Sequence, residues 1–265
     1  MVDDLATFSD FARTLAEAAR RETLKGCRGG LAGVENKLAE GFDPVTESDR
    51  NSEQAMRRLI EARFPEHGVA GEEFPDRPAA GPWSWSLDPI DGTRAYICGL
   101  PSWTTLIALL DQGEPVLGLV DVPRLDELYL GRPGGAWMIG GAEERRLATS
   151  ACRRLGDARL STTDPYLLEG LEAEGFERLR RSARLTRYGL DAYAYALVAA
   201  GSLDIVAESG LKPHDYNALV PLVRAAGGAV SNWSGGADLS AGQIVAAANE
   251  ALLEQACRLL ERDRL

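Results

Sequence analysis

Residues 104 to 138 consist of four short apolar segments separated by turn sequences. The segments "TLIALLD", "PVLGLVDV", "ELYLG" and "AWMIG" are joined by "QGE", "PRLD" and "RPGG". Gly, Pro and Asp favour tight turns, and tight turns join neighbouring strands that run in opposite directions. This stretch therefore predicts an antiparallel sheet.

Two helices are predicted before this sheet. Apolar residues recur at helical spacing between Leu5 and Leu15 and predict an amphipathic helix over residues 3–25. A second helix is predicted over residues 46–64, with Pro65 directly after its end. The segment "WSWSLD" alternates like a strand and ends at an aspartate. We expect both helices to pack on one face of the sheet.

After about residue 150 the pattern changes from consecutive strands to alternating strands and helices. Short apolar strands alternate with predicted helices over residues 166–180, 190–201, 215–227 and 249–262. Such alternation predicts a second layered domain with helices on its sheet. We therefore expect an N-terminal α+β domain over residues 1–150 and a smaller C-terminal α/β domain over residues 151–265.

The acidic composition argues against several classes of protein. The net charge is −11, whereas a nucleic-acid binder needs a basic face to neutralise phosphates. No apolar run reaches about 18 residues, the length that a membrane helix needs. The acidic N-terminus lacks the apolar core of a secretory signal. We therefore expect a cytoplasmic protein that binds neither nucleic acid nor membrane.

The few cysteines and histidines limit the available chemistry. Four cysteines are scattered without a C-x-x-C pair, which favours reduced thiols over a disulfide framework or a zinc site. The two histidines, His67 and His214, are too few to favour a His-rich zinc site or a Ser-His-Asp hydrolase. If the protein is an enzyme, carboxylates must carry most of its chemistry.

Four acidic clusters stand at the ends of predicted elements. They are "DPVTESD", "GEE", "DPIDGT" and "KPHD", which begin at residues 43, 71, 88 and 212. Mg²⁺ prefers oxygen ligands and is commonly bound by carboxylates together with substrate phosphate oxygens. Each cluster alone is most simply a solvated turn or a helix cap, and Asp215 alone is most simply the N-cap of the helix that follows it.

The hexapeptide "DPIDGT" has the chemistry of a cation site. Its proline fixes one backbone angle, so the turn can aim Asp88 and Asp91 at one point and leave the Ile90 carbonyl available. Gly92 lets the backbone come close to a ligand, and the N–H groups of Gly92 and Thr93 can open onto an anion. The hexapeptide can therefore hold a cation next to an anion.

The order of these clusters resembles the inositol-monophosphatase superfamily of Mg²⁺-dependent phosphatases. "GEE", then "DPIDGT" sixteen residues later, then an aspartate at a late helix start are its pattern, and Lys37 with "DPVTESD" also fits its N-terminal motif. The resemblance covers nearly the whole chain. It implies a layered α-β-α-β-α sandwich, a homodimer, and phosphate ester hydrolysis by metal-activated water.

The resemblance also implies roles for individual residues. The implied ligands of up to three Mg²⁺ are Glu72, Asp88, the Ile90 carbonyl, Asp91 and Asp215. Gly92 and Thr93 are implied to bind the phosphate, and Thr93 paired with Asp49 is implied to help deprotonate the attacking water, with Glu72 also catalytic. Lys37 and Arg94 are possible further contacts to phosphate or metal, or else a surface charge and an ion pair.

Longer stretches resemble the histidinol-phosphate phosphatase branch of this superfamily. These include "RYGLDAYAYALVAAGSLDIVAE" and His214, which stands where the family usually has tryptophan before the late aspartate. Histidinol phosphate carries an ammonium group and an imidazole, so its site needs carboxylates beyond the metal ligands. Asp191 and Glu208 match the substrate-side positions of the family.

Alternatives remain at this point. Asp191 is equally well explained as a helix N-cap, and Tyr188 or Tyr193 either contacts an imidazole ring or packs within the protein. An inositol-1-phosphate or broader sugar-phosphate phosphatase is the alternative enzyme. A catalytically idle, dimeric regulatory protein is the alternative from another class.

Overall fold

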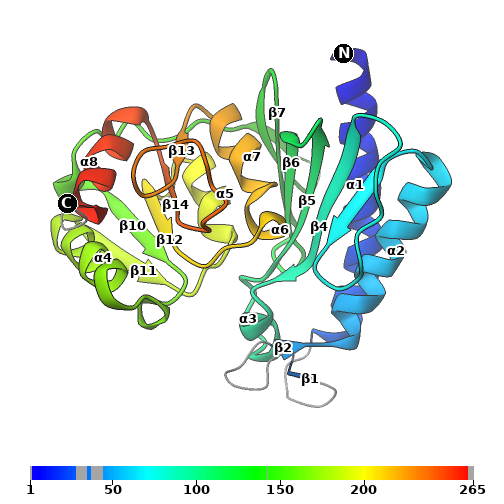
Figure 1. The fold of residues 1–265 in the computed structure, drawn as a ribbon, viewed down its shortest axis with the longest axis horizontal. Coiled ribbons are helices and arrows are strands. Elements are labelled where there is room, and N and C mark those ends of the chain that lie inside the picture. The colour runs from blue at the N-terminus through cyan, green and yellow to red at the C-terminus, as the bar shows by residue number, and fades with distance from the viewer. Residues whose placement is uncertain (1, 28–34, 37–43, 142, 262–265) are drawn as a thin grey trace.

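The protein folds into five layers of helices and sheets (Figure 1). The structure, a computed structural model, describes residues 2–27, 35–36, 44–141 and 143–261. Lys37 and Asp43, which the sequence placed near the candidate site, lie outside the described residues.

The N-terminal half contains a seven-stranded sheet in the order β3-β4-β5-β6-β7-β8-β9. Its strands are β3 (Gly68–Gly71), β4 (Trp83–Asp91), β5 (Thr104–Asp111), β6 (Glu114–Val122), β7 (Glu127–Arg132), β8 (Gly135–Gly140) and β9 (Glu143–Arg146). The predicted antiparallel meander is confirmed from β4 to β8. At one edge of the sheet, outside the predicted meander, β3 runs parallel to β4.

Two long helices cover one face of this sheet, as predicted. They are α1 (Val2–Gly26) and α2 (Glu47–Arg63), and the short strands β1 (Glu35–Asn36) and β2 (Pro44–Val45) pair with each other between them. Buried apolar residues of both helices, such as Leu15 and Ile60, pack against Trp85 and Ile107 of the sheet. This cluster forms the core under the outer face.

The C-terminal half contains a five-stranded mixed sheet in the order β11-β10-β12-β14-β13. Its strands are β10 (Arg159–Thr162), β11 (Leu185–Tyr188), β12 (Ile205–Glu208), β13 (Ala229–Ser231) and β14 (Ile244–Ala247). The helices α5 (Tyr193–Ala199), α6 (Pro213–Tyr216) and α7 (Leu219–Ala225) lie between the two sheets, and α4 (Gly170–Ser182) and α8 (Glu250–Leu260) cover the far face. The layered α-β-α-β-α sandwich is therefore confirmed.

One apolar cluster joins the two sheets through the middle layer. It contains buried residues of β5, β6, α5, α7 and β12. At Gly118 of β6, an added Cβ would lie 1.9 Å from the carbonyl oxygen of Ala218, which leaves no room for a side chain. Because α7 is pressed this closely onto β6, the short helix before it, α6, is held against β4.

Several helix boundaries differ from the predicted ones. The helix predicted over residues 215–227 is divided into α6 and α7, because Pro221 has no N–H to donate to the carbonyl four residues earlier. The helix predicted over 166–180 begins only at Gly170, after the 3-10 turn Pro165–Leu167. The short helix α3 (Thr93–Ile97) was not predicted.

Within the part of the chain that the structure describes, no helix combines the length and the apolar character needed to cross a membrane. The boundary expected near residue 150 falls between β9 of the first sheet and β10 of the second.

Candidate active site

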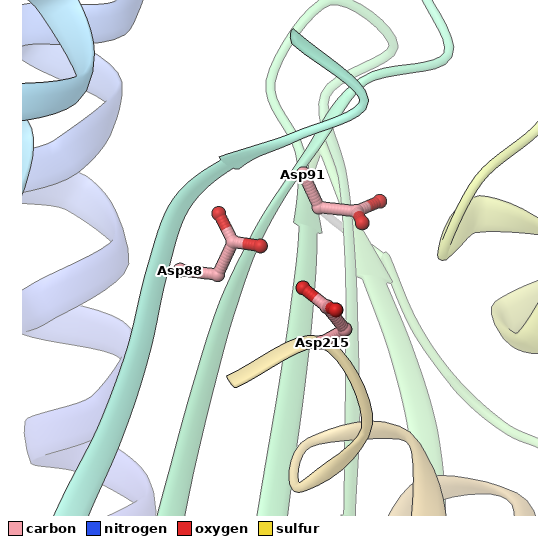
Figure 2. Close-up of side chains that lie close together, drawn as sticks. All are labelled: Asp88, Asp91 and Asp215. Atoms are coloured by element: carbon pink, nitrogen blue, oxygen red, sulfur yellow. The ribbon is translucent and has the colours of Figure 1, made fainter. Parts of the chain in front are cut away.

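Three carboxylates from two distant parts of the chain converge at the end of β4. Asp88 and Asp91 are among the last four residues of this strand, and Asp215 comes from α6. Each offers a ligand atom, and these atoms all lie within 4.8 Å of one another. Figure 2 shows the three side chains facing a common point from opposite sides. A divalent cation prefers such a set of oxygen ligands.

The hexapeptide forms this arrangement by interrupting the strand. The pairing of β4 with β5 shifts register between Asp88 and Asp91, which turns both carboxylates toward the same side. The N–H of Ile90 donates to Asp88 Oδ1 at 3.1 Å, and the Ile90 side chain is buried in a small apolar cluster. The Thr93 hydroxyl donates to the Ile90 carbonyl at 3.1 Å, and this oxygen keeps a second lone pair for a ligand.

Gly92 is required at its position for two reasons. Its φ of 81° lies in the left-handed region, which costs a residue with a side chain more than glycine. A Cβ there would also lie 2.9 Å from Asp191 Oδ2. The turn that follows Asp88 and Asp91 is therefore in direct contact with Asp191, which the sequence predicts to bind substrate.

The raised pKa values of the three acids favour the binding of a cation. Burial raises the pKa of Asp88 well above its ordinary value, and the negative charges of Glu72, Asp91 and Asp215 raise it further. Burial and then the charge of Asp191 raise the pKa of Asp91 in the same direction, and burial raises that of Asp215. A bound cation would remove this repulsion, so these residues suit a metal ion.

Asp215 is positioned by its own helix end. Its Oδ2 accepts a hydrogen bond from the Lys212 N–H at 2.7 Å, and its Oδ1 lies 3.5 Å from Nε2 of His214. The N-cap of α6 is Lys212, so the alternative reading of Asp215 as the N-cap is wrong. Asp215 is the third residue of the helix, with one oxygen aimed at Asp88 and Asp91.

Asp49 lies beside this cluster without the expected partner. Its Oδ2 accepts hydrogen bonds from the N–H and the hydroxyl of Thr46, at 2.8 and 2.5 Å, as part of a capping box at the start of α2. Because Thr93 donates to Ile90 instead, the predicted Thr93–Asp49 pair is not formed in this structure. Asp49 Oδ1 is buried without a hydrogen-bond partner in the described chain. Burial raises the pKa of Asp49 to about 7.

A cavity of about 500 Å³ contains the three acids and most of the other predicted site residues. Glu72 lies on its wall, outside the close group of three acids, and its neighbour Glu73 donates its N–H to Glu53 at 2.8 Å. The cavity is lined by every described residue with a predicted site role except Asp49, namely Glu72, Asp88, Ile90, Asp91, Gly92, Thr93, Arg94, Asp191, Glu208 and Asp215.

Two further carboxylates, Asp191 and Glu208, line the cavity outside the close group of three acids. Glu208 is only 5% exposed and accepts hydrogen bonds from both the N–H and the hydroxyl of Thr163, the N–H at 2.9 Å, and from the Tyr195 hydroxyl at 3.0 Å. Burial raises the pKa of Glu208 to about 7 and that of Asp191 to about 6. Burial disfavours the charged form of these two acids, as it does for Asp88 and Asp91, and a bound cation would favour that form.

Asp191 does not cap the following helix. It has a left-handed φ of 48°, and the N-cap of α5 is Ala192. The Ala192 N–H donates to Asp91 Oδ2 at 2.8 Å. The alternative reading of Asp191 as a cap is therefore wrong.

The structure decides between the two alternatives for Tyr193 and shows a role for Thr163 that the sequence did not indicate. The Tyr193 hydroxyl donates to Glu127 at 3.0 Å, and its ring contacts Tyr129, so it packs between the sheets instead of lining the cavity. Thr163 was missed. Its position after an apolar strand was visible, but its contact with Glu208 depends on β10 and β12 being neighbours.

Comparison with known proteins identifies the family of the chain. Residues 4–264 match the inositol monophosphatase family. The chain is 36% identical to the bifunctional phosphatase IMPL2, chloroplastic, of Arabidopsis thaliana, over 97% of this chain and 76% of that protein. It is 35% identical to a histidinol-phosphatase of Chlorobaculum parvum, over 79% of this chain and 80% of that protein.

A solved structure of an inositol monophosphatase from Zymomonas mobilis is also similar. It is 37% identical in sequence and superposes with a TM-score of 0.83 over 95% of this chain and 96% of that one. The family match spans almost the whole sequence, and the relatives are covered over most of their length. The chain therefore belongs to the inositol monophosphatase family, whose members are phosphatases.

Proposed function

We propose that the protein is a Mg²⁺-dependent phosphomonoesterase that hydrolyses L-histidinol phosphate to L-histidinol and phosphate. The observation that carries the choice of substrate is the pair Asp191 and Glu208, two carboxylates in the cavity that do not belong to the close group of three acids. An ammonium group on the substrate would pair with them and offset the cost of their burial.

The metal site would be formed by Asp88, Asp91, Asp215, Glu72 and the Ile90 carbonyl. When bound, Mg²⁺ supplies positive charge to the phosphate oxygens and lowers the pKa of a water molecule. Gly92 and Thr93 line the same cavity, and their N–H groups would bind the phosphate. The Thr93 hydroxyl holds the Ile90 carbonyl in place.

The relatives support both this proposal and one alternative. The protein from Chlorobaculum parvum is named a histidinol-phosphatase, and the protein from Zymomonas mobilis an inositol monophosphatase. The alternative is an inositol-1-phosphate or broader sugar-phosphate monophosphatase, because carboxylates also accept hydrogen bonds from the hydroxyls of a polyol. The charge of Asp191 and Glu208 favours the ammonium ester.

Comparison of substrates tests the proposal. Phosphate release in the presence of Mg²⁺ is measured with L-histidinol phosphate, inositol-1-phosphate and adenosine 3′,5′-bisphosphate. We expect the highest kcat/KM for histidinol phosphate. Equal or faster turnover of the inositol ester would assign the protein to the alternative, and no turnover of any ester would favour the idle regulatory protein.

We also propose a cytoplasmic homodimer, as the family resemblance implied. Sedimentation equilibrium measures the mass directly, and a monomer at all concentrations would refute this assembly. Neither property is needed for the substrate proposal.

A further inference from the structure

A second cavity opens beside the one that holds the acids. Its volume is about 1000 Å³, twice that of the first. The two cavities share five lining residues, which are Arg94, Thr163, Asp164, Leu168 and Asp191. A ligand whose charged group lies at Asp191 can therefore extend into the second cavity.

The wall of the second cavity offers flat apolar surface. Tyr188 of β11 is 44% exposed and lines this cavity together with Phe176 of α4 and Leu168. Leu100, which follows α3 and is half exposed, also lines it. An aromatic side chain with an accessible face binds the face or edge of another ring.

Most charged groups of this wall already have partners. Glu177 accepts hydrogen bonds from Arg180 at 2.5 Å and from Arg181 at 2.7 Å. Asp164 is different, because only its Oδ1 is used, accepting the N–H of Tyr166 at 3.0 Å as the N-cap of the 3-10 turn. Within the described chain, no hydrogen bond to its Oδ2 is found, and Asp164 lines both cavities.

We propose that the second cavity binds a heteroaromatic ring on the leaving group of the substrate, with Tyr188 against the ring and Asp164 accepting a ring N–H. This inference rests on the proposed function, since it extends the leaving group beyond Asp191 and Glu208. A polyol has no aromatic ring to place against Tyr188. Tyr188 and Asp164 would then select the ring, whereas Asp191 and Glu208 select the ammonium.

Three esters that differ only in the ring test this assignment. They are L-histidinol phosphate, L-phenylalaninol phosphate and L-alaninol phosphate, which carry an imidazole, a phenyl group and no ring. Wild-type protein should prefer both ring esters to the alaninol ester. Tyr188→Ala should lower kcat/KM about tenfold for both ring esters and leave the alaninol ester unchanged. Equal losses on all three esters, or no loss, would overturn the role of Tyr188.

Asp164→Asn distinguishes the contribution of the ring N–H from that of the ring face. Asparagine caps the turn as well as aspartate does, so the fold is kept while the charge is removed. We expect about a tenfold loss for the histidinol ester and little change for the phenylalaninol ester. A loss of the same size for both would refute the hydrogen bond from the ring.

Matched controls use residues outside both cavities. Leu185→Ala changes an exposed apolar residue on the same strand as Tyr188. Asp238→Asn changes an aspartate that also accepts an N–H two residues later, from Ser240 at 3.0 Å. Neither should alter the relative rates of the three esters.

The failure of this inference can be told apart from failure of the proposed function. If inositol-1-phosphate is the best substrate of the wild type, the proposed function fails. The preference of the wild type for the phenylalaninol ester over the alaninol ester reports on the second cavity alone. If that ratio is close to one, no ring subsite exists, even if histidinol phosphate is the best substrate.

Discussion

The Asp91 carboxylate accepts a hydrogen bond from the backbone N–H of Ala192, with 2.8 Å between Oδ2 and the nitrogen. The two residues are separated by 101 positions in the chain. Asp91 belongs to the close group of three acids, and Ala192 directly follows Asp191, which also lines the cavity. This hydrogen bond is therefore one of the contacts that join the metal side of the cavity to the substrate side across the two halves of the fold.

Replacing Asp91 by asparagine should remove activity without unfolding the protein. The amide oxygen can still accept from Ala192, whereas the negative charge needed for a cation is lost. We expect kcat/KM to fall by about a hundredfold or more with Mg²⁺ present. Asp111→Asn is a matched control, because Asp111 ends β5 and pairs with Trp83 at the far end of β4. A rate near that of the wild type for Asp91→Asn would contradict the metal role.

Replacing Glu208 by glutamine should affect ammonium esters selectively. The new side chain can accept from Thr163, and the Tyr195 hydroxyl can rotate to accept from its amide. We expect KM for histidinol phosphate to rise about tenfold or more, with a change of about threefold or less for inositol-1-phosphate. Steady-state kinetics on both esters measures this difference, and equal changes would count against an ammonium contact.

The site could be predicted from the sequence where its geometry is local. Asp88 and Asp91 share one turn, so the proline and glycine around them were enough to indicate that both side chains face one point. Asp215 is different, because only the family resemblance placed it beside them. The meander was predictable for the same local reason, since each of its turns lies between strands adjacent in sequence.

The remaining features depend on contacts between distant segments. Thr163 reaches Glu208 only because β10 and β12 are parallel neighbours. Helical spacing alone did not distinguish Tyr188 from Tyr193, since the orientation of Tyr193 follows from its bond to Glu127 on β7. The Thr93–Asp49 pair is not formed in this structure, because Thr93 donates to Ile90 and Asp49 caps its own helix through Thr46.

The Thr93 hydroxyl is expected to matter more than its methyl group. It donates to the Ile90 carbonyl, which is a proposed metal ligand, and it lines the cavity. Thr93→Ser keeps the hydroxyl and should retain activity within about threefold, whereas Thr93→Val should lose about a hundredfold. Thermal unfolding of both variants checks that they fold. Equal activity of the serine and valine variants would show that the hydroxyl has no role.

Without a metal ion, the protein should lose stability as the pH rises from about 5 to about 8. Burial raises the pKa of Asp49 and Glu208 to about 7 in the folded protein, from ordinary values of 3.8 and 4.5. The folded state therefore holds protons that the unfolded chain has released across this range. Stability falls with pH wherever the folded state binds more protons, so these carboxyls contribute most at the acidic end.

Mg²⁺ should oppose this loss of stability, because it competes with protons for Asp88, Asp91 and Asp215, whose pKa values burial also raises. We expect the rise in Tm on adding Mg²⁺ to be larger at about pH 8 than at about pH 5, where protons compete more strongly. Asp88→Asn removes one repelling charge, so it should raise the metal-free Tm at the higher pH and abolish the response to Mg²⁺. Melting curves with EDTA and with Mg²⁺ at both pH values measure these effects. A Mg²⁺ response of equal size at both pH values, or one kept by Asp88→Asn, would mean that the ion binds elsewhere.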